Sequence, residues 1–241
     1  MDVKEIDILG DNIMSHWYYR SKAFALSQLL GNKIGHNILD VGAGSGFFSR
    51  FLLQNTEAEQ SVCIDPAYLT EHVEEINGKQ IHFVKSIESS DADTILMTDV
   101  LEHIEDDAGF LRLYAEKTKK SSRFLITVPA FQFLWSGHDV FLEHYRRYTL
   151  RQLEEMVRKS GLIPTFGCYY FANVFPIACA MRLLTFHRQE IKSSLQRHSN
   201  PVNGILTLLC RIERFYMRWN RFFGLTACCF AEHPTVQETA E

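Results

Sequence analysis

The stretch Asn37-Ile-Leu-Asp-Val-Gly-Ala-Gly-Ser-Gly46 decides the fold. Apolar residues lead into Asp40, and glycines then occupy the alternate positions 42, 44 and 46. Glycine adopts left-handed backbone angles at no steric cost, and without a Cβ it lets the backbone approach a bound molecule closely. The pattern predicts a strand that turns into a helix around a ligand.

Asp65 indicates what that ligand carries. It ends a second apolar stretch, Ser61–Asp65, where a carboxylate can accept hydrogen bonds from both hydroxyls of a ribose. A dinucleotide-binding loop, G-x-G-x-x-G, needs a glycine at position 47, but the chain has Phe47 there. The spacing therefore predicts a nucleoside-bearing cofactor and argues against NAD.

The composition is that of one α/β domain with an insertion, because 241 residues with 46% hydrophobic content can fill a substantial core. We expect a single domain over residues 1–241. The N-terminal residues are acidic where a secretion signal would be basic, and the apolar run Val174–Met181 is too short to span a bilayer. The six cysteines show neither a C-x-x-C pair nor a zinc-like spacing with histidine, so we expect reduced cytoplasmic thiols and no metal.

Helix and strand signals alternate along most of the chain. An amphipathic helix is expected from Ser15 to Leu30, and a later one from Thr149 to Gly161, where Thr149 and Gln152 form a capping box. Further helices are expected at 46–54, 67–77 and 105–119, and strands at 37–41, 61–65, 81–86, 92–99 and 123–128. The strands are nearly continuous apolar runs, which predicts a Rossmann-like, doubly wound parallel sheet covered on both faces.

Two further segments carry side chains suited to chemistry. The run Asp99-Val-Leu-Glu-His-Ile-Glu-Asp-Asp107 begins where a strand ends, at the sheet edge where ligands bind. After the fifth strand, the stretch Val128–Thr149 is rich in aromatics, histidines and arginines. It is longer than the roughly two to six residues usual for such a connection, as functional loops often are.

These segments resemble the motifs of class I S-adenosylmethionine-dependent methyltransferases, in particular the bacterial type 11 and type 12 groups. The D-x-G-x-G-x-G pattern at 40–46 is similar to their first motif, and Asp99–Asp107 to their fourth-strand motif. Trp135, His138-Asp139 and His144-Tyr-Arg-Arg-Tyr148 resemble the region after their fifth strand. The resemblance covers residues 16–231.

The resemblance implies S-adenosylmethionine as cofactor and S-adenosylhomocysteine as product. The implied cofactor-binding residues are Trp17, Asp40, Gly42, Ala43, Gly44, Gly46, Asp65, Pro66, Ser86, Ile87, Asp99 and Val100. Residues 1–35 would form a helical cover over the cofactor. Where the family has an arginine near the methionine carboxylate of the cofactor, this chain has Lys22. A lysine cannot make the bidentate contact of an arginine, and Arg20 is the alternative residue for that contact.

The implied acceptor site lies in the loop after the fifth strand and holds Trp135, Tyr145, Arg146 and Arg147. A neutral histidine can take a proton as a methyl group arrives, so His144, His103 and His138 are candidates for a general base or for positioning the substrate. Alternatively, His144 and Arg147 brace the loop against the acids at 105–107. Glu102 and those acids are expected only to charge the first turn of a helix favourably.

By the same resemblance the sheet has seven strands, the first five parallel, with 166–171 and 225–231 forming a terminal hairpin. The basic segment 174–222 then becomes a helical insertion beside the active site. A helix over 203–223 would carry apolar residues on one face and arginines on the other. Its apolar face either packs on the sheet as a lid or contacts an anionic membrane. Nucleic acid is not expected, because the basic residues are confined to the insertion.

The expected function is methyl transfer to an oxygen or nitrogen of a small-molecule or lipid- or glycan-linked acceptor. The protein would be a cytoplasmic monomer or homodimer, or peripheral at the inner face of the membrane. Two alternatives stay open: a cofactor-binding sensor or accessory subunit without turnover, and an NAD-dependent oxidoreductase, against which Phe47 counts.

Overall fold

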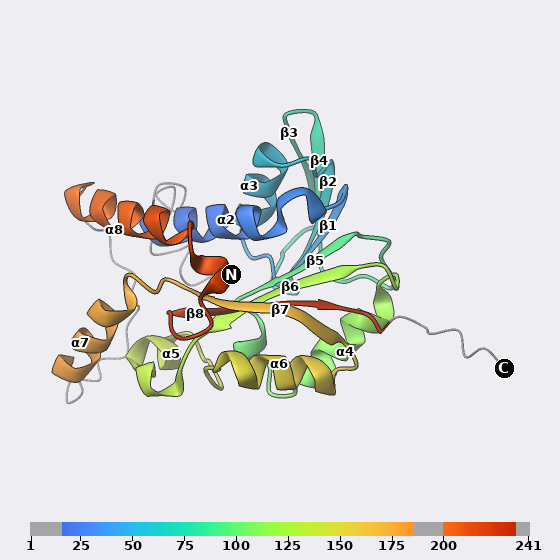
Figure 1. Ribbon diagram of the computed structural model, residues 1–241. Coiled ribbons are helices and arrows are strands. Elements are labelled where there is room, and N and C mark those ends of the chain that lie inside the picture. Colours follow the sequence, from blue (N-terminus) through green and yellow to red (C-terminus); the bar gives the residue numbers. More distant parts are fainter. Residues whose placement is uncertain (1–15, 186–199, 235–241) are drawn as a thin grey trace.

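The computed structural model describes residues 16–185 and 200–234 (Figure 1). The expectations for residues 1–15, for the basic residues at 188, 192 and 197, and for the C-terminal end lie outside the described residues.

The expected alternation of helices and strands is confirmed for most of the chain. The elements of the first half are α2 (Trp17–Leu30), η2 (Gly31–Lys33), β1 (Asn37–Val41), α3 (Phe47–Asn55), β2 (Gln60–Ile64), β3 (His72–Ile76), β4 (Lys79–Val84), β5 (Thr94–Thr98), η3 (Leu101–His103) and α4 (Asp107–Lys117). They are followed by β6 (Arg123–Pro129), η4 (Gln132–Leu134), α5 (Gly137–Phe141), α6 (Leu150–Lys159), β7 (Ile163–Tyr170), α7 (Phe175–Thr185), α8 (Asn200–Glu213), η5 (Met217–Trp219) and β8 (Thr226–Glu232). The capping box of Thr149 and Gln152 opens α6.

The strands of the described residues form one sheet in the order β3-β4-β2-β1-β5-β6-β8-β7. The five strands from β4 to β6 are parallel, whereas β8 runs antiparallel to both β6 and β7. The Rossmann-like, doubly wound arrangement and the terminal hairpin of β7 and β8 are therefore confirmed.

The sheet has eight strands instead of seven, and the expected helix at 67–77 is wrong. Strand β3 occupies this place and pairs antiparallel with β4, with Ile76 opposite Lys79. The two residues between them, Asn77 and Gly78, both have positive φ, 53° and 76°. An Asn-Gly pair is the strongest short signal for a two-residue hairpin turn, which explains why this segment forms a strand and not a helix.

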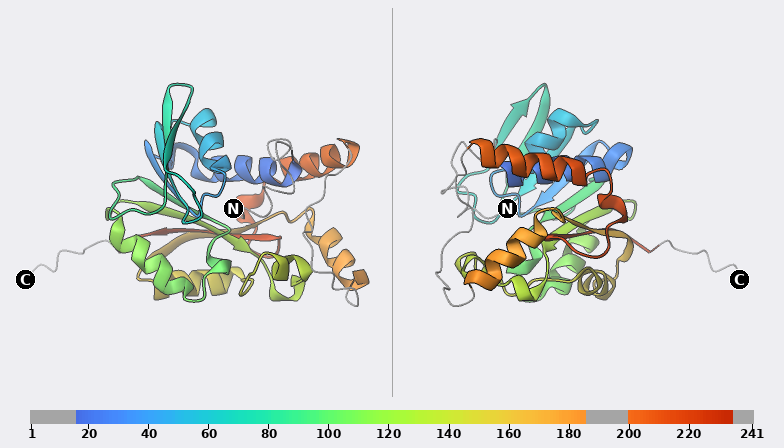
Figure 2. Two further views of the ribbon diagram at one scale, coloured as in Figure 1. Left: turned by 180° about the vertical axis from the view of Figure 1, so that it is seen from behind. Right: turned by 60° about the vertical axis from the view of Figure 1, so that its left-hand side comes forward.

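Helices cover both faces of the sheet (Figures 1 and 2). Alternate residues of a strand pack against the helices on opposite sides of the sheet, because successive side chains point to opposite faces. Leu96 and Leu125 pack with the side chains of α2 and α3, whereas Ile95 and Ile126 pack with those of α4 and α6. The result is a three-layer molecule whose parallel strands end at one shared edge.

The insertion leaves the sheet at that edge, because β7 runs parallel to β6 and leads directly into α7 (Figure 1). The expected helix over 203–223 is wrong beyond Glu213, where α8 ends. Tertiary bonds replace helical ones there: the Tyr169 amide donates to the Asn220 carbonyl at 2.7 Å, and Met217 is fully buried. The arginines consequently do not all lie on one face: Arg211 and Arg214 line a cavity, whereas Arg221 pairs with Glu154 of α6. Within the two described ranges, no helix combines the length and apolar character that crossing a bilayer requires.

Candidate active site

The glycine loop after β1 has the conformation that its sequence predicts. Gly42, Gly44 and Gly46 have φ values of 67°, 54° and 72°. The amide of Gly42 donates to the carbonyl of Ile64 at 2.8 Å, which holds the loop against the end of β2. A Cβ on Gly42 would lie 2.6 Å from Cγ2 of Val100, so only glycine lets the loop pack against the residues after β5.

Asp65 is fixed at the end of β2 by two backbone amides. Its Oδ2 accepts from the Gly44 amide at 3.0 Å and its Oδ1 from the Ala67 amide at 2.9 Å. The carboxylate therefore lies directly against the glycine loop. Each oxygen has a second lone pair, so both can still accept hydrogen bonds from a ligand.

Asp40 is buried beneath the loop. Its Oδ2 accepts from the Ser49 hydroxyl at 2.7 Å, and the oxygens of Ser49 and Ser61 lie 2.8 Å apart. Burial raises the pKa of Asp40 to about 6. In this structure Asp40 ties β1 to α3 and β2.

Asp99 follows β5 with a positive φ of 54° and is paired with Lys22 of α2. Its amide donates to the Thr127 carbonyl at 3.0 Å, which holds this backbone conformation. Lys22 is only 1% exposed. Burial opposes both charges, but each is stabilised by the other, so the pKa of Lys22 is raised and that of Asp99 is lowered. The ammonium group is thus committed to Asp99 and fastens α2 over the sheet edge.

Glu102, His103 and His144 form a cluster beside this pair. One potential ligand atom from each residue lies within 4.8 Å of the others, and the two imidazole rings pack edge to face with centroids 4.6 Å apart. Glu102 is 1% exposed, and neither of its carboxylate oxygens has a hydrogen-bond partner among residues 16–185 and 200–234. Burial, followed by the charge of Asp99, raises its pKa well above the usual value.

His144 is oriented by a buried carboxylate. Its Nδ1 lies 3.0 Å from Oδ1 of Asp139, and Arg147 holds the same carboxylate with Nε at 2.6 Å and Nη2 at 3.0 Å. Burial opposes the charge of Asp139, but the hydrogen bond from His144 and the charge of Arg147 prevail and hold its pKa well below the usual range. An Asp139 carboxylate favours the proton on Nδ1, so in the neutral ring the lone pair is on Nε2.

The other residues expected at the acceptor site have varied surroundings. Arg146 donates to Oδ2 of Asp107 at 2.9 Å and to the Glu105 carbonyl at 2.8 Å. Arg146 therefore braces the loop against the acids at 105–107, a role that the sequence suggested for His144 and Arg147. Tyr145 is exposed and Trp135 is half-buried. His138 lies on α5, outside the cluster of Glu102 and the two histidines.

The remaining residues expected at the cofactor have varied surroundings. The Trp17 ring packs in a core cluster with Phe171, centroids 5.7 Å apart, whereas Tyr19 of the same helix packs against Phe47 at the start of α3. Pro66 and Ser86 are exposed after β2 and β4. Ala43 is buried within the loop, and Ile87 packs against the core.

The sequence reasoning missed the roles of Glu102 and Asp139. Glu102 does not belong to the first turn of α4. It lies buried in the short helix η3, and α4 is capped by Asp106, which accepts from the Gly109 amide at 3.0 Å. The sequence contained a signal for Glu102. Within 99–107 it is the only acid that lies between a leucine and a histidine. Asp139, five residues before His144, offered a similar hint.

Solved structures share this fold. A putative methyltransferase of Haloferax volcanii, solved with the Trm112 methyltransferase activator, is 16% identical with a TM-score of 0.58, over 99% of this chain and 100% of that one. A putative methyltransferase of Bacillus halodurans is 14% identical, TM-score 0.55, over 89% of this chain and 100% of that one.

A phosphoethanolamine N-methyltransferase 2 of Haemonchus contortus, solved with phosphomonomethylethanolamine and S-adenosylhomocysteine, is 16% identical. Its TM-score is 0.56, over 97% of this chain and 57% of that one. No curated protein matches the sequence.

A family model described as a methyltransferase domain matches residues 14–164, which include the glycine loop, Asp65, Asp99 and His144. The chain therefore belongs to the methyltransferase domain family and is a class I S-adenosylmethionine-dependent methyltransferase.

Proposed function

We propose that the protein transfers a methyl group from S-adenosylmethionine to an oxygen or nitrogen of a small or lipid-linked acceptor. The observation that carries the proposal is the convergence, at one sheet edge, of the glycine loop, Asp65, Asp99 and the histidine cluster. The glycine loop and Asp65 would hold the cofactor, and Asp99 would border its methionine portion.

The sulfonium of this cofactor is already an activated methyl donor. The acceptor atom forms a bond to the methyl carbon as the carbon–sulfur bond breaks, and that electron pair stays on sulfur. The protein therefore has to align three atoms and exclude water, and positioning of this kind can contribute about 7–11 kcal/mol.

The cluster of Glu102, His103 and His144 supports a role at the acceptor. His144 has its Nδ1 turned to Asp139, so a neutral ring would keep on Nε2 the lone pair that a general base requires. Its Nε2 lone pair and the Glu102 carboxylate together could receive a hydroxyl or an amine.

A membrane-resident acceptor is supported by the surface of the insertion. Large apolar side chains of α7, α8 and the segment after α8 are exposed: Met181, Leu183, Leu184, Ile205, Leu208, Ile212, Phe215, Trp219 and Phe222. Exposed apolar side chains that gather into a patch mark interaction sites, and the insertion carries the nine just named. Because α7 and α8 lie at the edge that carries the site, a docked membrane would face the acceptor end (Figures 1 and 2).

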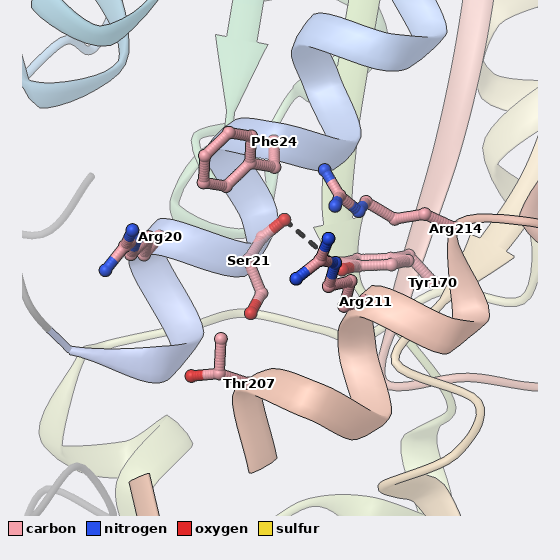
Figure 3. A pocket seen from close by; sticks show the side chains of 7 residues that line it. All are labelled: Arg20, Ser21, Phe24, Tyr170, Thr207, Arg211 and Arg214. Carbon is pink, nitrogen blue, oxygen red and sulfur yellow. Dashed lines mark hydrogen bonds between the residues drawn. The ribbon is translucent and has the colours of Figure 1, made fainter. Parts of the chain in front are cut away.

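Arginines give this surface a preference for anions. Arg20, Arg211 and Arg214 line a cavity of about 340 Å³ between α2 and α8, with Phe24 between them (Figure 3). The guanidinium carbon of Arg214 lies 5.0 Å from the Phe24 ring centroid, which supports its position without neutralising its charge. An anionic lipid headgroup has the complementary charge.

Two measurements test the proposal. Thermal unfolding with S-adenosylmethionine should show stabilisation that NADH does not give. Incubation of the protein and cofactor with candidate acceptors should then yield a product heavier by one methylene. If S-adenosylmethionine stabilises the protein but no alcohol, amine or lipid-linked sugar is methylated, the proposed enzymatic activity is contradicted.

That outcome would favour a cofactor-binding accessory subunit. Its support is that the Haloferax volcanii methyltransferase is solved with an activator protein. In this reading a partner protein covers the apolar surface of the insertion. The methyltransferase family assignment leaves no support for the NAD-dependent alternative.

A further inference from the structure

We propose that Glu102, His103 and His144 bind a divalent transition-metal ion at the carboxyl-end edge of the sheet. The sequence-based expectation of no metal considered cysteine patterns and zinc-like spacings, and this cluster has neither. It is assembled from η3 and from the loop after β6, which are distant in sequence.

The ligand set is suited to such an ion. A carboxylate and two imidazoles lie within 4.8 Å of one another, a separation that a common central ion can bridge. Two histidines with one carboxylate bind zinc or iron in many proteins, and imidazole favours these ions over magnesium and calcium. Three protein ligands leave coordination positions for water or an acceptor.

Glu102 supplies an independent observation. A buried carboxylate without a hydrogen-bond partner is costly, and such groups in folded proteins normally have a partner or bind a cation. Both oxygens of Glu102 lack one among residues 16–185 and 200–234. Lys22, a buried cation nearby, is already paired with Asp99. A bound cation would satisfy both oxygens.

The surroundings of His144 support the same assignment. A metal-binding histidine almost always donates its other ring N–H to a carboxylate, which fixes the ring and raises its basicity. Asp139 takes this position at 3.0 Å from Nδ1, and Arg147 clamps Asp139 with two hydrogen bonds. The lone pair of Nε2 is thereby directed away from Asp139 and available to an ion.

The ion's task in catalysis rests on the proposed methyl transfer and favours an oxygen acceptor. A hydroxyl bound to a divalent ion loses its proton to solvent more readily. The resulting oxyanion would form the oxygen–carbon bond to the methyl group as the carbon–sulfur bond breaks and its electrons stay on sulfur. His144 would then act as a ligand and not as the base.

Cobalt(II) is the probe for the test, because its visible spectrum reports coordination. The full-length protein is freed of metal with a chelator and titrated with cobalt(II), and the affinity is checked by calorimetry with zinc(II). We expect one ion per chain and d–d absorption bands. Glu102→Gln and His144→Ala should weaken binding at least about 100-fold, and Asp139→Asn about 10–100-fold.

His36→Ala is the matched control. His36 is an exposed histidine that faces Glu59 at 3.1 Å, at the start of β1 and therefore at the opposite edge of the sheet. Its removal should leave cobalt binding unchanged. Because Glu102→Gln removes an unpaired buried carboxylate, the metal-free variant should unfold at a temperature no lower than the metal-free wild type. Loss of binding in this variant would therefore not reflect misfolding.

Equal cobalt affinity in wild type, Glu102→Gln and His144→Ala would overturn the proposal, as would a wild type that binds no ion. Stabilisation by S-adenosylmethionine is measured in the same samples. If it persists while cobalt does not bind, the metal site alone fails. If the wild type binds cobalt but not the cofactor, the methyltransferase function fails instead.

Discussion

At the residue scale, the site depends on a few positions where the backbone conformation or the neighbouring charge permits few residue types. The glycine loop could be predicted from its letters, because positive φ at alternate positions is a property of glycine itself. The pairing of Lys22 with Asp99 and the approach of His144 to Glu102 could not. Each joins segments far apart in sequence, and a lysine or an acid in the sequence does not indicate which side chain it will meet.

Gly44 provides the sharpest test of the loop. In Gly44→Val, a β-branched side chain at φ 54° has to adopt a disfavoured backbone conformation beside the Asp65 carboxylate. We expect S-adenosylmethionine affinity to fall by at least about 100-fold in calorimetry, roughly 2.7 kcal/mol. Gly78→Val, at φ 76° in the β3–β4 turn, imposes comparable strain far from the loop and should retain cofactor affinity. Similar affinities in both variants would mean that the cofactor binds elsewhere.

Lys22 tests the buried ion pair. Lys22→Met leaves Asp99 charged and without its cation, and breaking a buried pair in this way costs about 3–5 kcal/mol in the free energy of unfolding. Urea denaturation measures the loss. Arg151→Met, which breaks an exposed pair with Glu155 on α6, should leave the denaturation midpoint unchanged. A Lys22→Met midpoint equal to that of the wild type would show that the pair contributes nothing.

At the element scale, strong local signals predicted the elements and tertiary contacts determined their ends. The capping box of α6 and the apolar runs of β1 and β5 appear where expected. The Asn77-Gly78 turn is also a local signal, and it indicates the hairpin that stands in place of the expected helix at 67–77. The end of α8 is different, because Glu213 accepts the Ala172 amide at 2.7 Å, a contact that only the folded chain brings together.

Glu213 also makes the stability of this junction depend on pH. Burial raises its pKa from 4.5 to about 7, so the folded chain binds this proton more tightly than the unfolded chain. The free energy of unfolding therefore falls as pH rises from about 4.5 to about 7 and levels off above, by about 3 kcal/mol for this group. Glu213→Gln cannot titrate. The stability of wild type minus that of the variant, from urea denaturation, should decline across this window, and a constant difference would refute the shift.

At the scale of the whole molecule, the sheet positions the residues of the candidate site, and the insertion lies beside that site. The parallel strands place the glycine loop, Asp65, Asp99 and the Glu102 cluster at one edge, and β7 delivers α7 and α8 to that same edge. The doubly wound order could be predicted from alternating signals. The course of the insertion could not, because its apolar residues divide between a buried side, such as Cys210 and Met217, and an exposed one.

The exposed side of the insertion gives the last prediction. Phe215 and Phe222 are 81% and 80% exposed, and if they enter a membrane interface, Phe215→Ser with Phe222→Ser should abolish cosedimentation with vesicles containing anionic phospholipid. The folded stability should hardly change, because neither ring is buried. Leu69→Ser removes an equally exposed apolar residue, 93% exposed, from the β2–β3 connection and should leave vesicle binding intact. Raised salt should weaken wild-type binding, since Arg20, Arg211 and Arg214 supply the electrostatic part. If the wild type stays in the supernatant at low salt, the apolar surface instead meets a protein partner or a soluble acceptor.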